Sequence, residues 1–352
     1  MKTILIMAGG TGGHIFPALA VAEELRDRGW TIVWLGSKTG MESKLVPQHG
    51  YRIEWLRFAG LRGKGFARAL LLPLNLLIAF AQSARVIFRV RPDVVLGMGG
   101  YVSFPGGMMA VLLARPLVLH EQNSVAGLAN KVLARVADRI LVAFPDALKN
   151  GEWTGNPVRR DIAGLPAPEK RFRGRSGNLK LLVIGGSLGA RALNETVPRA
   201  LALLPQPLRL EVTHQAGEKH LAALEDAYRK AGVDATAVAF IGDMSSAYAT
   251  ADVVICRAGA LTVAELAAAG VASVLIPFPS AVDDHQSANA RYLADHSAAI
   301  LLSQSELTPR RLADLLLGFT RETLLEMAKR ARALGKPAAA QLVAQHCMAA
   351  AA

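Results

Sequence analysis

The sequence contains few cysteines and few aromatic residues. Its two cysteines, Cys256 and Cys347, do not have the spacing of a metal-binding pair, and nothing about them suggests a disulfide framework. We interpret Cys256 as a small core residue in an apolar strand. Aromatic residues make up 6% of the chain, and they are not interleaved with basic residues as in RNA-binding modules. We therefore expect no nucleic-acid partner.

Long apolar runs are also missing. No run reaches the ~18 residues that a membrane-spanning helix requires. The N-terminal segment, Met1–Met7, has too short an apolar run for a secretory signal peptide, and glycines follow soon after it. These two absences predict a cytosolic protein without a spanning helix.

The residues that are present indicate a large, packed and basic protein. Hydrophobic residues make up 52% and charged residues 19% of the 352 residues, which is enough for a core and suggests two domains. The formal net charge of +12 indicates an anionic partner. An acidic membrane surface and a phosphorylated substrate are the better candidates.

The N-terminal residues predict the opening of a doubly wound α/β sheet. Thr3–Ala8 is an apolar strand, Gly9–His14 a glycine-rich loop, Pro17–Arg28 a helix and Thr31–Leu35 a second strand. The loop is not a dinucleotide-binding fingerprint, because Ile15 occupies the position of its third glycine. It is not a Walker loop either, since no Lys-Ser or Lys-Thr pair follows the glycines.

The same pattern returns in the second half of the chain. Lys180–Ile184 is apolar, and Gly185–Ala190 is another glycine-rich loop before a helix. The intervening Leu165–Asn178 is rich in proline, glycine and charge, so we predict the linker there. The expected fold is α/β, with two Rossmann-like doubly wound domains, residues 1–164 and 165–352, facing each other across a cleft. The last helix is a candidate to pack back on the first domain.

One stretch of the second half carries a nucleotide-binding signal. Val253–Cys256 predicts a buried strand, and Ala260–Ala269 has the composition of a helix. The backbone N–H groups at the start of this helix would bind an anion. Glu265, one turn later, suits a ribose diol, whereas Gln286 and Asn289 suit an uncharged sugar. The alternative is an ordinary strand-loop-helix with a solvated Glu265.

Polar residues also follow a strand of the first half. Leu117–Leu119 leads into His120, Glu121, Gln122 and Asn123, at a carboxyl end where open α/β sheets bind ligands. A catalytic role for His120 or Glu121 and a local turn network are both compatible with this pattern.

The segment Phe66–Phe88 predicts a long helix with an unusual apolar centre, Leu70–Phe80. Cations flank that centre at Arg62, Lys64, Arg68, Arg85, Arg89 and Arg91. An apolar run between cations favours contact with an anionic membrane surface. The alternative is a buried helix that covers the sheet.

Six segments in order resemble the MurG family of peptidoglycan N-acetylglucosaminyltransferases, which have the GT-B fold. They are Gly9–His14, Gly99–Ser103, His120–Asn123, Gly155–Arg159, Gly185–Gly189 and Arg257–Glu265. The resemblance implies inverting transfer of GlcNAc from UDP-GlcNAc to the C4 hydroxyl of undecaprenyl-diphospho-MurNAc-pentapeptide. It also implies a peripheral enzyme of peptidoglycan synthesis, and hence of cell shape and division, on the cytoplasmic face of the bacterial inner membrane. The first domain would hold the acceptor and the second the UDP-GlcNAc.

The resemblance also implies roles for individual residues. Ser187 and the helix start, Ala260, Leu261, Thr262, Val263 and Ala264, would hold the diphosphate, and Arg159 would add charge. Ile241 would line the uracil pocket through its backbone, and Glu265 would accept from the ribose. Gln286, Asn123, Thr11, Gly12 and Gly13 would contact the GlcNAc.

The remaining expectations concern chemistry and rival functions. His14 is the candidate general base, with Glu121 and His120 as alternatives. We expect no cofactor and no metal, because Asp283-Asp284 is not the Asp-x-Asp metal motif of the other glycosyltransferase fold. Where the family can have serine, this chain has Ala258 and Ala264, which keep the backbone donors. The rivals are another UDP-sugar enzyme, such as a lipid glycosyltransferase or a UDP-GlcNAc epimerase, and a non-enzymatic binding protein.

Overall fold

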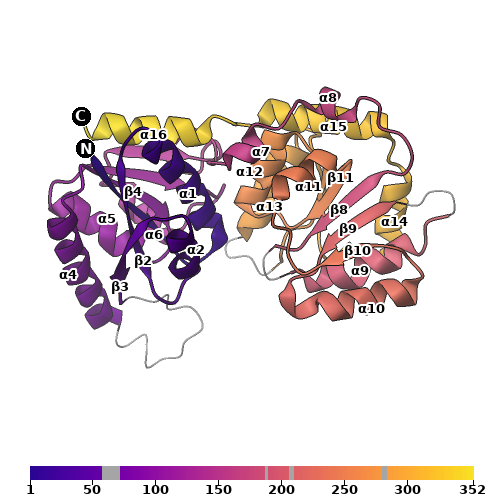
Figure 1. Cartoon of the computed structure of the whole chain (residues 1–352), viewed down its shortest axis with the longest axis horizontal. Coiled ribbons are helices and arrows are strands. Elements are labelled where there is room, and N and C mark those ends of the chain that lie inside the picture. Colours follow the sequence, from indigo (N-terminus) through magenta and orange to yellow (C-terminus); the bar gives the residue numbers. More distant parts are fainter. Residues whose placement is uncertain (58–71, 187–188, 206–209, 280–283) are drawn as a thin grey trace. The chain divides into compact units, whose positions relative to one another are not determined.

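The computed structural model describes residues 1–57, 72–186, 189–205, 210–279 and 284–352. The chain divides into two compact units, Met1–Arg159 together with Pro337–Ala352, and Arg160–Lys336. Each unit contains one sheet of parallel strands with helices packed against it (Figure 1). The predicted pair of doubly wound α/β domains is therefore confirmed.

The first unit contains a seven-stranded sheet in the order β3-β2-β1-β4-β5-β6-β7. Its strands are β1 (Thr3–Ala8), β2 (Thr31–Ser37), β3 (Arg52–Leu56), β4 (Val94–Gly99), β5 (Leu117–Glu121), β6 (Arg139–Val142) and β7 (Glu152–Trp153). Its helices are α1 (Gly12–Arg26), α2 (Glu42–Gln48), α4 (Leu72–Val90), α5 (Ser103–Leu112), α6 (Leu128–Leu133) and α16 (Ala339–Ala350). The strand order reverses between β1 and β4, which is where open α/β sheets bind ligands.

The alternation of side chains along β1 creates a core on each face of this sheet. Ile4 and Ile6 pack with residues of α1 and α16, and Leu5 and Met7 pack with residues of α4 and α5. All four side chains are fully buried. Burial of each such side chain stabilises the fold by about 1.5–3 kcal/mol. An apolar strand without alternation is thus explained by helices on both faces.

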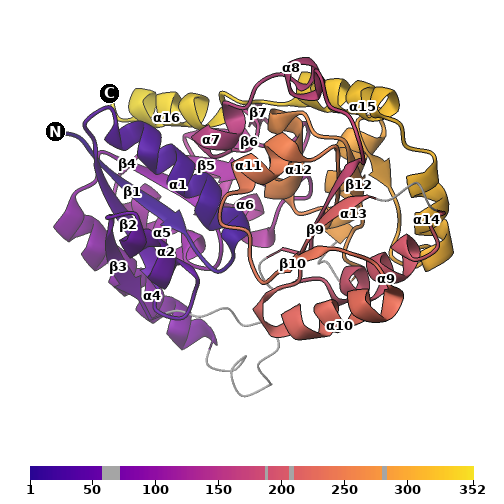
Figure 2. The same ribbon diagram turned by 45° about the vertical axis from the view of Figure 1, so that its right-hand side comes forward.

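The last helix belongs to the first unit, although it follows the second in sequence. Helix α16 packs against α1 (Figure 2). Val343, Ala344 and Cys347 are fully buried in the same core as Ile4 and Ile6. The unit boundaries, residues 159/160 and 336/337, therefore differ from the single boundary at 164/165 that the sequence predicted.

The second unit contains a six-stranded sheet in the order β10-β9-β8-β11-β12-β13. Its strands are β8 (Lys180–Ile184), β9 (Glu211–Gln215), β10 (Thr236–Val238), β11 (Val253–Cys256), β12 (Ser273–Leu275) and β13 (Ile300–Leu301). Its helices are α7 (Arg160–Ala163), α8 (Pro168–Phe172), α9 (Arg191–Leu201), η1 (Glu218–His220), α10 (Leu221–Ala231), α11 (Met244–Thr250), α12 (Ala260–Ala269), α13 (His285–Ala294), α14 (Pro309–Leu317) and α15 (Arg321–Leu334). Here the reversal falls between β8 and β11.

The segment predicted as a linker, Leu165–Asn178, is instead packed within the second unit. Arg171 donates hydrogen bonds to the carbonyls of Tyr248, Ala269 and Gly270. Arg175 pairs with the buried carboxylate of Asp252. The charges that suggested a solvated linker are used to bind the ends of helices, and for that reason the sequence interpretation was wrong.

Candidate functional site

The loop after β1 leads into α1 earlier than the sequence predicted. The helix begins at Gly12 rather than at Pro17, because His14 N and Ile15 N both donate to Thr11 O, at 3.1 and 3.3 Å. Thr11 is the N-cap residue, and its side chain makes no cap hydrogen bond. Gly12, Gly13 and His14 thus form the first turn, in which the N–H groups of Gly12 and Gly13 lack acceptors within the helix. An anion or a sugar hydroxyl is a suitable acceptor for them.

The glycine-rich loop after β1 is held in place by a buried carboxylate that was not predicted from the sequence. Glu42 of α2 is fully buried. It accepts hydrogen bonds from Gly10 N at 3.0 Å and from Ser37 N at 2.9 Å. A Cβ at Gly9 would lie 2.9 Å from Glu42 Oε1, so the lack of a side chain permits this approach. The Gly10 N–H is therefore already used, and the backbone donors that remain available in this segment are those at the helix start.

His14 is joined to the end of β5 by a chain of hydrogen bonds. His14 Nδ1 lies 2.6 Å from Gln122 Oε1. Gln122 Nε2 lies 2.9 Å from His120 Nδ1, and His120 Nε2 lies 2.9 Å from Gly155 O. His14 is partly exposed, whereas His120 and Gln122 are buried. The structure thus brings together two predicted site segments, Gly9–His14 and His120–Asn123.

Glu121 is directed into its own loop. It is buried, and its Oε1 accepts from Asn123 N at 2.9 Å and from Asn123 Nδ2 at 3.3 Å. Its Oε2 accepts from Asn130 Nδ2 at 2.8 Å and from Gly127 N at 3.3 Å. With these four hydrogen bonds Glu121 acts as a clamp on the connection between β5 and α6. This is the local turn network that the sequence analysis gave as the alternative to a catalytic role. Asn123, the predicted sugar contact, is fixed by this clamp.

Burial keeps His120 neutral and makes the stability of the first unit pH-dependent. Desolvation lowers the pKa of His120 from 6.5 to about 4. Between these values the unfolded chain binds a proton that the folded chain does not. The stabilisation is therefore present above pH 6.5 and is lost as the pH falls towards 4. We expect the unfolding free energy to fall by about 1 kcal/mol from pH 6 to pH 5 through this residue. Denaturant titrations should show a smaller fall in His120→Asn, and equal falls would contradict the assignment.

The start of α12 provides backbone donors in the second unit. Gly259 is its N-cap residue, with extended backbone and no side-chain cap, and Val263 N donates to Gly259 O at 3.0 Å. The helix spans the predicted Ala260–Ala269. The N–H groups of Ala260, Leu261 and Thr262 have no acceptor within the helix, and the helix dipole favours an anion there. Val263 and Ala264 complete this first turn.

Glu265 is buried rather than solvated. Only 5% of it is exposed. Its Oε2 accepts from the hydroxyl of Tyr248 at 3.2 Å, and Tyr248 is itself buried on α11. The alternative of a solvated Glu265 is thus wrong. Tyr248 was missed, because its distance in sequence gives no sign of the contact.

A glutamine at the end of β9 connects two segments that were predicted to bind UDP-GlcNAc. Gln215 Nε2 donates to Gly186 O at 2.9 Å, and Gln215 Oε1 accepts from Ile241 N at 3.0 Å. The Ile241 N–H is therefore engaged, which leaves its carbonyl as the backbone group for a base. Gly189 has φ +76°, and a Cβ there would lie 1.9 Å from Ala216 O, so this turn requires glycine. Ser187 lies outside the described residues.

Gln286 and Asn289 lie in α13, the helix that follows β12 in the chain. Gln286 Oε1 accepts from Phe278 N at 2.9 Å, and Asn289, fully buried, donates to Ala258 O at 3.3 Å. Arg257 donates to the carbonyls of Ile276 and Pro277. These contacts hold the loops after β11 and β12 together. The Gln286 amide nitrogen remains suitable for a sugar hydroxyl.

Arg159 belongs to the first unit, as the last residue of its segment Met1–Arg159. Its guanidinium lies 5.7 Å from the centre of the Phe16 ring on α1. A cation–π contact of this kind holds an arginine in place. Arg159 is predicted to contact a diphosphate, and its guanidinium lies beside α1, the helix that also carries His14.

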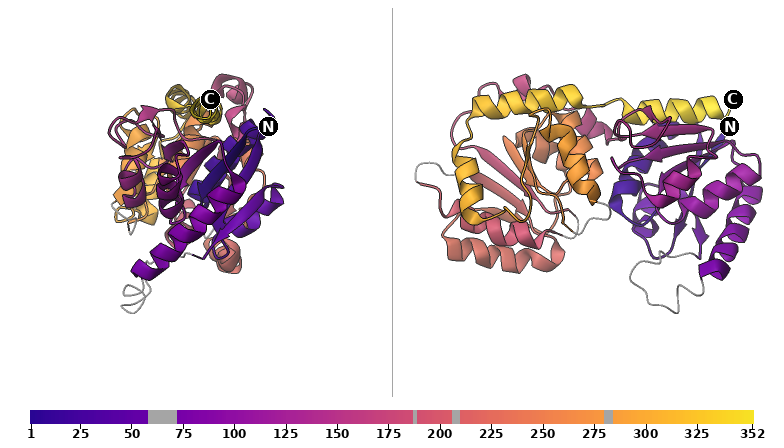
Figure 3. Two further views of the ribbon diagram at one scale, coloured as in Figure 1. Left: turned by 90° about the vertical axis from the view of Figure 1, so that its left-hand side faces the viewer. Right: turned by 180° about the vertical axis from the view of Figure 1, so that it is seen from behind.

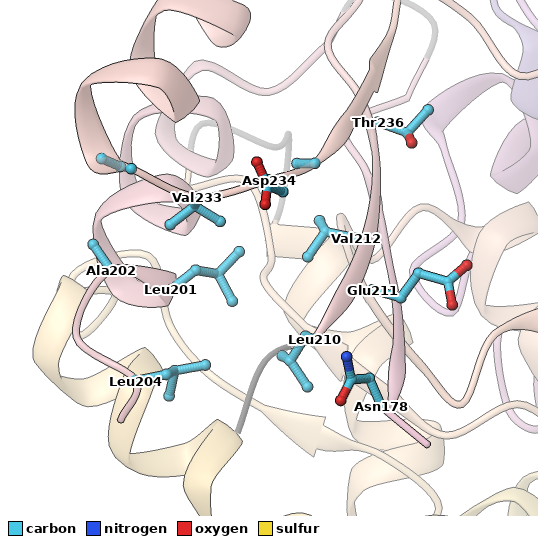
Figure 4. Close-up of a pocket in the computed structure, with 13 residues that line it drawn as sticks. Asn178, Leu201, Ala202, Leu204, Leu210, Glu211, Val212, Val233, Asp234 and Thr236 are labelled. Carbon is cyan, nitrogen blue, oxygen red and sulfur yellow. The ribbon is translucent and has the colours of Figure 1, made fainter. Parts of the chain in front are cut away.

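One pocket of the second unit lies away from these loops. It is lined by Asn178, Glu211 and Thr236, which precede or begin β8, β9 and β10, together with apolar residues such as Leu201 and Val233 (Figure 4). The strands are parallel, so this is the amino edge of the sheet. Ligand sites of open α/β sheets lie at the carboxyl edge, which is where the loops described above emerge.

Neither a metal-binding cluster nor a membrane-spanning helix is present among the described residues. No group of three or more His, Cys, Asp or Glu side chains among them is arranged to hold a metal ion. No helix among them combines the length and the apolar character that a membrane span requires.

Comparison with known proteins identifies the class. Residues 4–142 match the glycosyltransferase family 28 N-terminal domain, and residues 180–343 match its C-terminal domain. A crystal structure of Acinetobacter baumannii MurG is 40% identical, with a TM-score of 0.86 over 99% of this chain and 100% of that one. A Neisseria meningitidis UDP-GlcNAc 2-epimerase has a TM-score of 0.67 at 10% identity, over 99% of this chain and 100% of that one, and shares the fold alone. The two family matches and the MurG structure thus identify the chain as a glycosyltransferase with the GT-B fold.

Curated relatives narrow the class to one family. Proteins of Dechloromonas aromatica (strain RCB) and Aromatoleum aromaticum (strain DSM 19018 / LMG 30748 / EbN1) are 62% and 64% identical. The matches cover 98% and 99% of this chain and 98% and 97% of theirs. Both are named UDP-N-acetylglucosamine–N-acetylmuramyl-(pentapeptide) pyrophosphoryl-undecaprenol N-acetylglucosamine transferase. The chain belongs to the MurG family, as its motifs predicted.

Proposed function

We propose that the protein transfers GlcNAc from UDP-GlcNAc to the C4 hydroxyl of undecaprenyl-diphospho-MurNAc-pentapeptide. The observation that carries the donor assignment is the pairing, on one helix, of N-terminal backbone donors with the buried carboxylate of Glu265. The donors suit a diphosphate, and a carboxylate one turn along suits a ribose diol. The names of relatives 62% and 64% identical supply the sugar and the acceptor.

The second unit holds the donor in this proposal. The α12 start and Ser187 bind the diphosphate, Ile241 the base and Glu265 the ribose. Gln286 contacts the GlcNAc. Stabilisation of the leaving UDP comes from the helix N–H groups and from Arg159.

The first unit holds the acceptor, and His14 acts as the general base. The acceptor C4 oxygen attacks C1 of the sugar while the bond from C1 to the UDP oxygen breaks, and UDP leaves with the electron pair. The hydroxyl proton passes to His14. Among the three candidate bases, His14 alone is partly exposed, whereas Glu121 and His120 are buried. Glu121 has its oxygens occupied, and the pKa of His120 is lowered to about 4 by burial.

The exposed side of α4 supports contact with the membrane that carries the acceptor. Ala79, Ser83, Val86 and Ile87 face the core, and α5 lies alongside (Figure 3). The other side presents four large apolar residues, Leu74, Leu77, Ile78 and Phe88, with exposed fractions of 56%, 65%, 40% and 65%. Such a stripe is typical of an interfacial helix.

The flanking cations contribute unequally to this surface. Arg85, Arg89 and Arg91 are all exposed, and Arg89 also pairs with Glu54. Leu70, Leu71 and the three preceding cations, Arg62, Lys64 and Arg68, lie outside the described residues. We place the protein peripherally on the cytoplasmic face of the bacterial inner membrane, in the synthesis of peptidoglycan.

We expect Leu74→Glu with Leu77→Glu to weaken binding to anionic vesicles by about tenfold, because two apolar side chains no longer enter the interface. Sedimentation with vesicles rich in phosphatidylglycerol measures this. Binding of the unchanged protein should also fall with salt. Leu203→Glu, a change at an exposed leucine of the second unit, is the matched control. Equal binding by the double variant and the control would exclude α4 as the contact.

A single assay separates the proposed function from its rivals. The protein is incubated with UDP-GlcNAc, with and without a lipid acceptor that has a shortened, soluble tail. The proposal requires UDP release and a β-linked disaccharide only when the acceptor is present. Conversion of UDP-GlcNAc without acceptor would indicate an epimerase, and binding without turnover would indicate a binding protein.

A further inference from the structure

The hydrogen bonds behind His14 specify which of its ring nitrogens carries the proton. We propose that Gln122, oriented by His120, holds neutral His14 with its proton on Nδ1, so that Nε2 has the lone pair that accepts the proton of the attacking hydroxyl. Gln122 is then a positioning residue for the base. This inference rests on the proposed function, since it concerns how His14 acts there.

The series of hydrogen bonds that ends at His14 starts at the carbonyl oxygen of Gly155. A backbone carbonyl only accepts hydrogen bonds, so Gly155 O requires a proton on His120 Nε2, 2.9 Å away. His120 is fully buried, and burial favours its neutral form. A neutral imidazole with a proton on Nε2 has a lone pair on Nδ1. His120 Nδ1 is therefore an acceptor.

The orientation of the Gln122 amide follows from two acceptors. One end of the amide lies 2.9 Å from His120 Nδ1 and 2.8 Å from His120 O. Only the NH₂ end can face two acceptors, because an oxygen there would meet a carbonyl oxygen and a lone pair. The Gln122 carbonyl oxygen must then point the other way, towards His14.

That oxygen determines the tautomer of His14. Gln122 Oε1 lies 2.6 Å from His14 Nδ1, and an amide oxygen can only accept. Nδ1 must therefore carry the proton, and in neutral His14 the lone pair is on Nε2. When Nε2 takes the substrate proton, Nδ1 keeps its proton and its bond to Gln122. The ring thus needs no rearrangement during the transfer.

Gly99 provides the space for this pair. A Cβ on Gly99 would lie 2.8 Å from Nδ1 and Cε1 of His14 and 3.4 Å from Gln122 Oε1. Gly99 has φ +100°, a conformation that also favours glycine. The second glycine loop of the first unit therefore has a role beyond ligand contact, which is to let His14 approach Gln122.

The tautomer can be measured in the unmodified protein. ¹⁵N-labelled histidine and long-range proton–nitrogen correlation spectra, recorded at a pH where His14 is neutral, distinguish a protonated from an unprotonated ring nitrogen. Two other histidines serve as references, since His49 Nδ1 donates to Leu45 O and His120 Nε2 donates to Gly155 O. We expect His14 to show the pattern of His49. The pattern of His120 at His14 would overturn the inference, whatever the activity.

A variant links the tautomer to the rate. Gln122→Leu should give His14 a mixture of tautomers and lower kcat by about tenfold or more at saturating substrates, with UDP affinity unchanged. An unaltered His14 spectrum in a folded Gln122→Leu protein would overturn the inference. If this variant does not fold, the spectrum of the unmodified protein still decides. A His14→Ala protein with normal kcat would instead overturn the base assignment, so the two failures are distinguishable.

Discussion

Replacement of His14 by alanine should lower kcat by about 10²–10⁴-fold, the usual contribution of a positioned general base. Its affinity for UDP should not change, because His14 is not among the proposed UDP contacts. Rates at saturating UDP-GlcNAc and soluble-tailed acceptor, together with calorimetry of UDP binding, measure both quantities. A loss of kcat with retained UDP affinity is the expected pair of results.

Glu121→Gln is the matched variant for this experiment. Glu121 accepts from donors on Asn123, Gly127 and Asn130, so the change should disturb the β5–α6 connection and the stability of the first unit. Its effect on kcat should be smaller than that of His14→Ala once the protein is shown to be folded. A stable Glu121→Gln enzyme without turnover, beside a His14→Ala enzyme with nearly normal kcat, would assign the base to Glu121.

Replacement of Glu265 by alanine should raise the Kd for UDP by about 10- to 100-fold. The reason is the loss of hydrogen bonds from the ribose to a charged acceptor, worth about 1.5–3 kcal/mol. Glu265 is buried, so the carboxylate is already desolvated and directed before the nucleotide arrives. Calorimetric titration of both proteins with UDP, without added metal, gives the two constants.

The ribose contact can be separated from a general loss of structure. The unmodified protein should bind 2′-deoxy-UDP more weakly than UDP, and Glu265→Ala should bind the two nearly equally. Tyr248→Phe, which removes the hydroxyl that donates to Glu265 Oε2, is the control for a disturbed carboxylate. If Glu265→Ala still discriminates between the two nucleotides as the unmodified protein does, Glu265 is not the ribose contact.

Several features of the fold and site were predictable from local sequence. β1 and β8 were placed at their observed bounds, because continuous apolar runs followed by glycines describe parallel strands covered on both faces. Helix α12 was placed at Ala260–Ala269, and this local geometry puts Glu265 one turn after the helix start. Such features depend on residues only a few positions apart.

The sequence misled where a polar segment has distant partners. Leu165–Asn178 has the composition of a linker, yet Arg171 and Arg175 contact residues more than 70 positions away. Similarly, α16 follows the second unit in the chain and packs in the core of the first. The composition of a segment indicates how polar it is, but not which other part of the chain it packs against.

By itself, the sequence determined two α/β units, their glycine loops and the chemical groups available to a nucleotide and a sugar, because strand and helix periodicity and turn chemistry are local. Only the tertiary structure decided how those groups are used. The strand order puts β4 and β5 beyond β1, so that His14 meets Gln122, 108 residues away, while Glu121 turns into its own loop. Glu42 and Tyr248 gained their roles in the same way. A hydrogen bond requires its donor and acceptor atoms to be placed to within a fraction of an ångström. Packing, not spacing in the sequence, sets where a side chain points and hence where those atoms lie.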